Sequence, residues 1–541
     1  MNNFLKKPLF PFLFAVFPVL SLFASNTNEL KLTHIVTPLL FSLFLIVNIW
    51  ALLYFFLKDR KKAGFLASIM FLLSFSYGHI VNVIESEELP GWVTSNIVFP
   101  IIERWPLEIY GICSVVFLIM IIRLLKNKWG QIAPRLYVLN VVSAAMLILP
   151  LVTIAKTQLN RVQMPVRLFN PPIVQQPSTK APHDLPDIYY IILDRYASNE
   201  TLLNYYDFDN SGFTTFLKSK GFYVAQKSFA NYPFTSPSLA SSLNMNYIDD
   251  LASQIDPEVR DSTPLYERIQ DNAVALTLKA KGYKFLYYGP QTLPGVPMDS
   301  NKHADYVYAY SENAFSLSAF DFFFWGQSVV PPIISRLWNN EKFAAPGRNS
   351  LVRRTKYAMQ LDEIEKVSTT VRLKGPKFIF FHSLLTHPPN VLDIDGTYVP
   401  EAIARKRSPK ENYLRQLQFS NYLIQQLIET ILEDSLNPPI IVLQSDEGPY
   451  PQRFREHNLS FDWREATADE MKEKMGILNA YYFPGVSQNM FYPTITPVNT
   501  FRIIFNKYLG TQLPLLPDKN FGQIQFYFPY AFFDATNLLH E

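Results

Sequence analysis

The amino-acid sequence predicts a membrane domain of about five transmembrane helices, followed by an α/β domain with a mostly parallel central sheet. Long apolar runs fill the region before residue 156, whereas short apolar strands alternate with helical patterns from Asp187 onward. The predicted strands 187–193 and 440–444, which are largely apolar, are also followed closely by the carboxylates Asp194 and Asp446. Buried parallel strands have such runs, and ligands collect at their carboxyl ends.

Five apolar segments approach the ~20 residues that are needed to cross a bilayer. The first follows Lys6 and Lys7 and ends at Ala24-Ser25, as a cleaved signal peptide would. We favour an uncleaved span because further spans follow it. The five segments are 8–25, 36–57, 63–84, 106–122 and 136–154.

Charged residues divide the predicted loops into two kinds. Basic residues crowd the second and fourth loops, whereas acidic residues mark the third. Because cytoplasmic loops carry the excess of lysine and arginine, the N-terminus lies in the cytoplasm, and an odd number of spans places everything after about Lys156 outside. The basic residues are Lys58, Arg60, Lys61 and Lys62, then Arg123, Lys126, Lys128 and Arg135, and the acidic ones are Glu85, Glu87 and Glu88.

The remaining composition excludes two classes of protein. The net charge is only +3, and the basic residues gather beside spans, so we expect no nucleic-acid partner. The single cysteine, Cys113, lies inside a predicted span. An intramolecular disulfide is therefore excluded, and the exported domain must fold on its core alone.

We expect four parts along the chain. They are a membrane domain over 1–156, a proline-rich linker over 157–186, an α/β domain over 187–510 and a tail over 511–541 that packs on this domain. The tail forms a final edge strand or a loop over the pocket. Predicted strands are 187–193, 221–225, 283–288, 377–381, 440–444 and 477–483, and predicted helices are 210–220, 265–281, 412–432 and 466–475.

An aromatic and proline-bearing stretch, 311–354, interrupts the α/β domain. Four interpretations remain open for it: a lid, a substrate-facing insert, a patch resting on the bilayer, or an insertion that packs on its own aromatics.

Carboxylates mark the predicted edge of the sheet. Asp194 follows the first strand, and Asp446-Glu447 follows the strand 440–444. Adjacent carboxylates repel unless a cation lies between them, and a divalent cation is the usual solution. The plain alternatives are a solvated acidic turn and a simple strand-end carboxylate. Their joint placement favours a metal site.

A hydroxyl group would reach the same edge from the segment Thr235-Ser-Pro-Ser238. Ser236-Pro237 is typical of an N-cap followed by proline at the first helical position. The Thr235 hydroxyl would then lie at or just before a helix N-terminus, where the partial positive charge favours an alkoxide or oxyanion. The alternative is that Thr235 and Ser236 merely cap the helix.

Histidines follow the strand 377–381 at His382 and His387. Either can hold a proton for a leaving group or bind an anionic oxygen. We expect one of the two to be structural and favour His387 for the chemistry, since it lies further into the loop. His457 follows the Asp446-Glu447 pair by about ten residues and is a weaker candidate for lining the site.

These segments resemble, in the same order, the sulfatase-like branch of the alkaline phosphatase superfamily. The matching stretches are Ile191-Ile-Leu-Asp194, Thr235-Ser-Pro-Ser-Leu-Ala-Ser-Ser-Leu243, Thr386-His387-Pro388 and Gln444-Ser-Asp446-Glu447-Gly448. The resemblance spans about residues 187–510. The resemblance implies an alkaline phosphatase-type α/β fold.

The departures from the sulfatase pattern exclude formylglycine-dependent hydrolysis of sulfate esters. Thr235 stands where a sulfatase has a cysteine or serine for conversion to formylglycine, and Leu239 replaces the motif's arginine. In this respect the chain resembles the membrane-anchored phosphoethanolamine transferases and lipoteichoic acid synthases of the same superfamily, which also have about five spans before an extracytoplasmic domain. That resemblance implies a bacterial-type inner (cytoplasmic) membrane and a phospho-threonine intermediate.

The resemblance also implies roles for individual residues. Asp194, Thr235, Asp446 and Glu447 would bind a divalent metal, with Thr235 as nucleophile. His387 would contact the phosphoryl group or protonate the leaving group, while His382 and His457 are weaker candidates for substrate binding. Arg195 stands where sulfatases have a second aspartate, which limits the site to one metal. Glu447 replaces the usual histidine or asparagine, so Mn²⁺ or Mg²⁺ is favoured over Zn²⁺.

Two hypotheses for the function follow. The first is a metal-dependent transferase or hydrolase that acts on phosphate esters, less so sulfate esters, of lipid headgroups or cell-envelope glycans. The second is a catalytically inactive relative that binds an envelope polymer or a partner. It is motivated by the missing second aspartate and arginine, and by a segment 285–290 without the anion-binding lysine and histidine of sulfatases. Metal retention separates the two. A transporter role has little support, because His79 is the only ionisable residue deep in a span.

Overall fold

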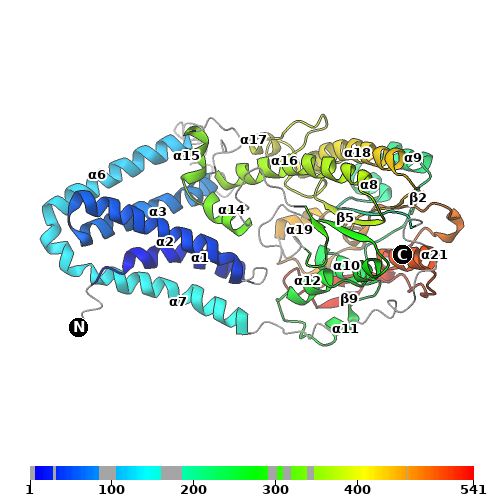
Figure 1. Ribbon diagram of the computed structural model, residues 1–541, viewed down its shortest axis with the longest axis horizontal. Helices are drawn as coiled ribbons and strands as arrows, with labels where there is room; N and C mark the ends of the chain where they lie inside the picture. The colour runs from blue at the N-terminus through cyan, green and yellow to red at the C-terminus, as the bar shows by residue number, and fades with distance from the viewer. Residues whose placement is uncertain are drawn as a thin grey trace. The chain divides into compact units, whose positions relative to one another are not determined.

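The computed structural model describes residues 7–27, 32–84, 105–159, 185–289, 301–308, 319–337, 347–457 and 460–540. These residues form two compact units. The first holds the described residues up to 159, together with 319–337 and 347–355. The second holds the rest of the described chain (Figure 1). Most of the predicted linker lies outside the described residues, and the four-part division of the chain stays a prediction.

The first unit consists of apolar helices, as the sequence predicts. Four of them are long and apolar enough to cross a membrane, and a shorter apolar helix of 16 residues precedes them. Large apolar side chains such as Phe56 and Leu149 are exposed along these helices. Such surfaces are stable in lipid and not in water. The helices are α1 (Phe10–Ser25), α2 (Val36–Leu57), α3 (Arg60–Ile84), α6 (Pro106–Ile132) and α7 (Tyr137–Leu159).

Helix α1 packs on α7, α3 and α2. Its first backbone N–H groups, which have no partner within the helix, are satisfied by Asn140 of α7. The Asn140 Oδ1 atom accepts hydrogen bonds from the N–H groups of Leu9 (2.9 Å) and Phe10 (2.8 Å). The Asn140 Nδ2 group donates to the Lys7 carbonyl at 2.8 Å. A polar side chain inside the apolar unit therefore fixes where α1 begins.

The described part of the aromatic insert belongs to this helical unit. Helix α14 (Ala319–Gly326) buries Phe320 against Phe23 and Phe324 against Phe75. The residues after α14 are tied to α3 through backbone hydrogen bonds from Gly78 to the Gln327 carbonyl and from Val329 to the Ser74 carbonyl, both 2.9 Å. The described insert thus packs on the apolar helices rather than mainly on its own aromatics.

The second unit is built on a seven-stranded sheet in the order β2-β7-β6-β1-β5-β3-β4. The neighbours β6, β1, β5, β3 and β4 are parallel, and β7 runs antiparallel to β6 and β2. The prediction of a mostly parallel sheet is confirmed. The strands are β1 (Ile188–Leu193), β2 (Tyr223–Val224), β3 (Lys284–Tyr288), β4 (Tyr306–Val307), β5 (Lys377–Ser383), β6 (Ile440–Gln444) and β7 (Asn479–Tyr482).

One predicted helix, 265–281, is two helices in the structure. It divides into α12 (Thr263–Gln270) and α13 (Ala273–Ala280). The break occurs because the Asn272 side chain accepts a hydrogen bond from the Ala275 N–H group at 2.8 Å and caps the second helix. The other helices of this unit are α8 (Asn199–Tyr206), α9 (Ser211–Ser219), α10 (Thr235–Ser242), α11 (Asp249–Ala252), α17 (Glu401–Ala404), α18 (Pro409–Asp434), α19 (Gln452–His457), α20 (Ala468–Met475), α21 (Thr500–Tyr508) and α22 (Thr536–His540). In addition, α15 (Val330–Leu337) follows α14, and α16 (Gly347–Thr369) begins among the residues grouped with the helical unit.

The C-terminal residues form a separate two-stranded sheet of β8 (Phe521–Gln523) and β9 (Phe532–Asp534), which differs from the edge strand considered above. This hairpin supports the segment that leads into α10. The Phe521 N–H group donates to the Asn231 carbonyl at 2.9 Å, and the Asn231 side chain donates to the Lys519 carbonyl at 2.8 Å. The start of α10 is therefore held from the C-terminal side of the chain.

We predict that Gly78→Ala destabilises the helical unit. A Cβ atom at Gly78 would lie 2.6 Å from the Gln327 Cα atom, so the backbone of the insert must move. Overpacking of this kind costs about 1–3 kcal/mol, and the apparent melting temperature in detergent should fall by several degrees. Gly111→Ala on α6, where a Cβ meets open space, is the matched control and should melt at or above the parent temperature. Equal melting of the two variants would contradict the described packing.

Candidate metal and nucleophile site

The strand register brings three chemistry-bearing residues to one edge of the sheet. Ile192 on β1 pairs with His382 on β5 and with Gln444 on β6. Side chains two residues apart along a strand lie on the same face. Asp194 follows Ile192 by two residues and Asp446 follows Gln444 by two. The alternation therefore places both carboxylates on the face that carries His382.

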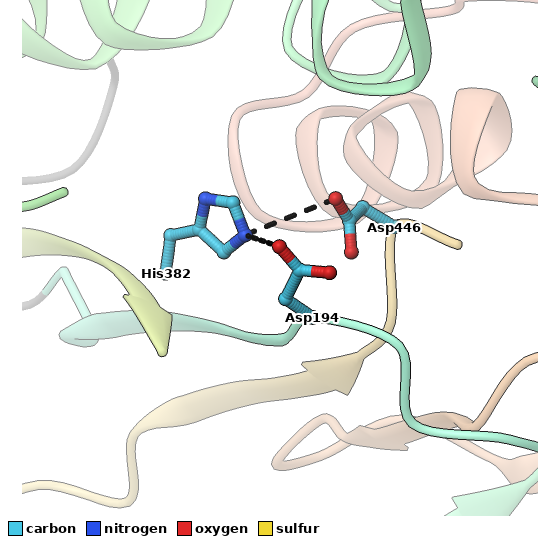
Figure 2. A group of neighbouring side chains, drawn as sticks. All are labelled: Asp194, His382 and Asp446. Carbon is cyan, nitrogen blue, oxygen red and sulfur yellow. Dashed lines mark ion pairs between the residues drawn. The ribbon is translucent and has the colours of Figure 1, made fainter. Parts of the chain in front are cut away.

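Figure 2 shows these three side chains converging from the ends of three neighbouring strands. The His382 Nε2 atom lies 3.3 Å from Asp194 Oδ2 and 3.8 Å from Asp446 Oδ2. One ligating atom from each residue falls within 4.8 Å of the others. All three side chains are buried. We call Asp194, His382 and Asp446 the carboxylate–histidine cluster.

Two hydroxyl groups bind main-chain carbonyls of the cluster and not its carboxylate oxygens. Thr386 Oγ1 donates to the Asp194 carbonyl at 2.6 Å, and Ser238 Oγ of α10 donates to the Asp446 carbonyl at 2.8 Å. Among the hydrogen bonds of the described residues, none reaches Asp194 Oδ1 or either carboxylate oxygen of Asp446.

The two carboxylates differ in pKa. Burial and the nearby Asp194 charge raise the pKa of Asp446 to about 7, against a smaller opposing effect of His382. Burial also raises the pKa of Asp194, but its neighbours His387 and His382 outweigh burial and hold that pKa below its ordinary value. Without a further cation, the cluster therefore carries one stable carboxylate and one that resists ionisation.

The cluster fits a divalent metal ion. Buried carboxylate oxygens without partners are costly, and a bound cation would satisfy them and lower the pKa of Asp446. Carboxylate oxygen and imidazole nitrogen are both common metal donors. The sequence analysis placed His382 among the weaker candidates for substrate binding. In the strand register His382 pairs with Ile192, two residues before Asp194, and this pairing would have placed it on the same face as the carboxylates.

Glu447 lies in a different environment from its neighbour Asp446. Its Oε1 atom is 3.0 Å from Arg195 Nε, and its Oε2 atom is 3.1 Å from Lys474 Nζ. Burial raises the pKa of Glu447 against the opposing effects of these two cations. The carboxylate that the resemblance assigns to the metal is therefore engaged in two buried ion pairs, and its ligand role stays a prediction.

Thr235 is the first residue of α10 and is half-buried. The helix begins earlier than Ser236-Pro237 suggested, because Phe234 is the extended residue before it and no side chain caps it. The Thr235 hydroxyl lies close enough to Asp446 to lower the pKa of that carboxyl. The structure thus brings Thr235, at a helix N-terminus, beside the carboxylate–histidine cluster.

The other two histidines occupy different surroundings. His387 is half-buried in the loop after β5, where its Nδ1 atom contacts the Pro388 carbonyl and the buried Lys356 ammonium donates to the His387 carbonyl. Burial and the Arg195 charge hold the pKa of His387 well below its ordinary value. His457 is exposed at the end of α19 and stacks on Phe461. No described contact joins His457 to the cluster.

Comparison with known proteins identifies the family. A sulfatase family model matches residues 186–481, which is more than half of the chain. The chain belongs to the sulfatase family. This confirms the predicted superfamily and fold class, while a search of curated proteins found no match.

Solved structures with a similar fold include both transferases and sulfatases. The C-terminal periplasmic domain of EptC from Escherichia coli, in complex with Zn, has 12% identity and a TM-score of 0.40, covering 66% of this chain and 96% of that one. The soluble domain of lipooligosaccharide phosphoethanolamine transferase A from Neisseria meningitidis has 11% identity and a TM-score of 0.36, covering 61% and 89%. A 2-O GAG sulfatase has 12% identity and a TM-score of 0.36, covering 61% and 72%.

We predict that Asp446→Asn stabilises the metal-stripped protein, and more so at higher pH. Because the folded-state pKa of about 7 exceeds the ordinary value of 3.8, the folded state keeps a proton that the unfolded chain has released, and stability falls as pH rises between these values. At pH 8 the variant should gain up to about 4 kcal/mol over the parent, and at pH 4 almost nothing.

Denaturant unfolding at pH 4, 6 and 8 in the presence of a chelator measures this effect. Asp434→Asn, at an exposed position at the end of α18, is the matched control and should leave the unfolding free energy unchanged relative to the parent at each pH. A pH-independent gain at Asp446 would contradict the electrostatic account.

Proposed function

We propose that this protein is a membrane-anchored, metal-dependent transferase that acts on phosphate esters of lipid headgroups or cell-envelope glycans, with Thr235 as nucleophile. One observation carries the proposal. Thr235 is the first residue of α10, and its hydroxyl lies beside Asp446 of the carboxylate–histidine cluster. A hydroxyl at a helix N-terminus, next to a site that fits a divalent cation, has the setting of an activated nucleophile.

The nucleophile favours phosphate over sulfate chemistry within this family. Formylglycine requires a cysteine or serine precursor, and position 235 is threonine. The single cysteine, Cys113, lies in α6 of the helical unit. An unmodified hydroxyl therefore has to attack directly, and phosphate esters are the substrates that such a nucleophile converts to a covalent phospho-enzyme.

The proposed reaction has two displacements. In the first, Thr235 Oγ forms a bond to phosphorus, the bond from phosphorus to the leaving alcohol breaks, and that alcohol departs with a proton. In the second, an acceptor hydroxyl attacks the phospho-threonine and Thr235 regains its proton. A divalent metal held by Asp194, His382 and Asp446 would lower the pKa of the attacking hydroxyl and offset negative charge on the phosphate.

His387 is suited to move the proton. Its Nδ1 atom contacts the Pro388 carbonyl, so that nitrogen carries the proton of the neutral ring and Nε2 keeps its lone pair. We infer that Nε2 accepts the proton of an attacking hydroxyl and returns it to the departing oxygen. The mixed donor set of two carboxylates and an imidazole suits Mn²⁺ or Zn²⁺ better than Mg²⁺, which prefers oxygen ligands alone. This choice revises the preference drawn from Glu447.

The predicted membrane topology of the helical unit favours a lipid-linked substrate. Basic residues gather in the loops that the positive-inside rule assigns to the cytoplasm, which leaves the sulfatase-family domain on the outer side of a bacterial-type inner membrane. A domain tethered there would meet lipid headgroups or lipid-linked glycans at the membrane surface.

A second candidate function is an inactive relative that binds an envelope polymer or partner. The observation that favours it is the buried pairing of Glu447 with Arg195 and Lys474, which occupies one of the expected metal ligands. Such a protein would have no need to retain a metal.

Metal analysis of the detergent-purified protein separates the two functions. We expect about one divalent ion per chain, lowered about tenfold or more by Asp194→Asn or His382→Ala. Glu447→Gln should retain the ion, and His457→Ala is the matched histidine control. Absence of metal from the parent protein, even after excess Mn²⁺ or Zn²⁺ is added, would contradict the transferase and support the binding protein. Loss in Glu447→Gln with retention in His382→Ala would restore the ligand set implied by the resemblance.

Covalent labelling tests the nucleophile. After incubation with phosphatidylethanolamine vesicles or a water-soluble phosphodiester, mass spectrometry should find a phosphorylated adduct on Thr235. Thr235→Ser should keep the adduct, and Thr235→Ala should lose it while retaining the metal. Ser236→Ala, one residue along α10, is the control and should be labelled as the parent is. An adduct that persists in Thr235→Ala would assign the nucleophile elsewhere.

A further inference from the structure

Arg195 has an unusual backbone conformation directly after the ligand candidate Asp194. Its φ angle is 63°, in the left-handed region, which costs a residue other than glycine about 1–2 kcal/mol. The surroundings enforce this conformation: the Tyr413 hydroxyl donates to the Arg195 carbonyl at 2.9 Å, and the Asp194 N–H group donates to the Ser383 carbonyl at 3.0 Å. Strain of this kind persists where a fold needs a side chain aimed in one direction.

The Arg195 side chain is fixed at its Nε atom and along one face. Nε donates to Glu447 Oε1 at 3.0 Å and lies 3.9 Å from Asp194 Oδ1. The guanidinium carbon lies 3.9 Å from the centre of the Tyr450 ring. The side chain is 14% exposed, so the group is largely, but not fully, enclosed.

The terminal nitrogens of Arg195 are available for a ligand. In the part of the chain that the structure describes, Nε is the only guanidinium atom of Arg195 that donates a hydrogen bond. A guanidinium carries further N–H donors at both Nη atoms, in a planar fork that matches two oxygens of a phosphate. Glu447 and Tyr450 thus orient a fork whose open side keeps its donors.

Lys474 completes the support from behind. Its ammonium lies 3.1 Å from Glu447 Oε2, donates to the Gly448 carbonyl at 3.1 Å, and lies 3.9 Å from the centre of the same Tyr450 ring. Its side chain is fully buried. Lys474 therefore balances Glu447, and Glu447 can hold Arg195 without cancelling its charge.

Charge balance indicates what the fork would bind. With all three carboxylates ionised, Asp194, Asp446 and Glu447 carry one more negative charge than the cations Arg195 and Lys474 offset. A divalent ion in the carboxylate–histidine cluster reverses the balance to one positive charge. The loaded site would therefore complement one negative charge, the charge of a phosphodiester.

We propose that Arg195 binds the phosphate group of the substrate through its Nη atoms, and that Glu447, Tyr450 and Lys474 are positioning residues for it. This inference rests on the proposed function for the class of substrate. Arg195 supplies a fixed cation beside Asp194, with Nε 3.9 Å from Asp194 Oδ1, so that the phosphate is held between the terminal guanidinium nitrogens and the cluster.

Binding of inorganic phosphate to the metal-loaded full-length protein in detergent, measured by calorimetry, tests the proposal. Arg195→Gly is the main variant, because glycine adopts a positive φ without strain and leaves Glu447 paired with Lys474. We expect phosphate affinity to fall about tenfold or more, with unchanged metal content. Added guanidinium ion at millimolar concentration should restore part of the affinity, which no purely structural role would produce.

A second variant and a control complete the design. Glu447→Gln keeps Arg195 but frees it, so phosphate should bind more weakly than to the parent and more tightly than to Arg195→Gly. Arg453→Gln, which removes a surface guanidinium paired with Glu470, should bind phosphate as the parent does. With phosphodiester substrates, Arg195→Gly should raise KM for lipid vesicles and for a water-soluble phosphodiester alike, since both share the phosphate.

The outcomes separate this proposal from the proposed function. Parental phosphate affinity in Arg195→Gly, or no phosphate binding by the metal-loaded parent, would overturn the assignment of Arg195 even if Thr235 is labelled. Absence of metal and of the Thr235 adduct in the parent would overturn the transferase itself. Loss of affinity with rescue by guanidinium supports the assignment.

Discussion

The burial of three carboxylates at one edge of the sheet is the constraint on which the rest of the site depends. Asp194, Asp446 and Glu447 are all buried, and like charges at this spacing repel strongly away from water. The fold answers with two cations from different parts of the chain, Arg195 after β1 and Lys474 on α20, and both are directed to Glu447. The remaining two carboxylates, Asp194 and Asp446, share His382 as their closest cationic neighbour.

This division produces a closed half and an open half. In the closed half, Glu447 pairs with Lys474 and with the Nε atom of Arg195, and the Tyr450 ring lies against both cations. In the open half, hydroxyl groups bind the main-chain carbonyls of Asp194 and Asp446 and leave carboxylate oxygens without partners. A fold that placed those hydroxyls on the carboxylates would be more stable without a metal. The arrangement keeps these acceptor oxygens available for a cation.

The sequence predicted the frame of the site because its signals are local. Unbroken apolar runs located the main strands, and strand ends located Asp194 and Asp446. The ion pair of Glu447 with Lys474 could not be predicted, since the two residues are distant in sequence. The sequence also did not show that the consecutive side chains of Asp446 and Glu447 point to different partners. The single-residue cap at Asn272, which divides one expected helix, is equally local but resembles ordinary helical sequence. The packing of Phe320 on Phe23 depends on tertiary structure alone.

The same charge arrangement bears on the class of substrate. A site with one net positive charge when a divalent ion is bound would match a phosphodiester, whereas a phosphate monoester would bring a second negative charge that Arg195, Lys474 and the ion do not offset. Sulfate esters also carry one negative charge, so charge alone does not separate them from phosphodiesters. The proposed nucleophile does, because Thr235 would offer an unmodified hydroxyl where sulfatases use formylglycine. The charge disfavours phosphate monoesters, and the proposed nucleophile disfavours sulfate esters. Together they favour phosphodiester transfer.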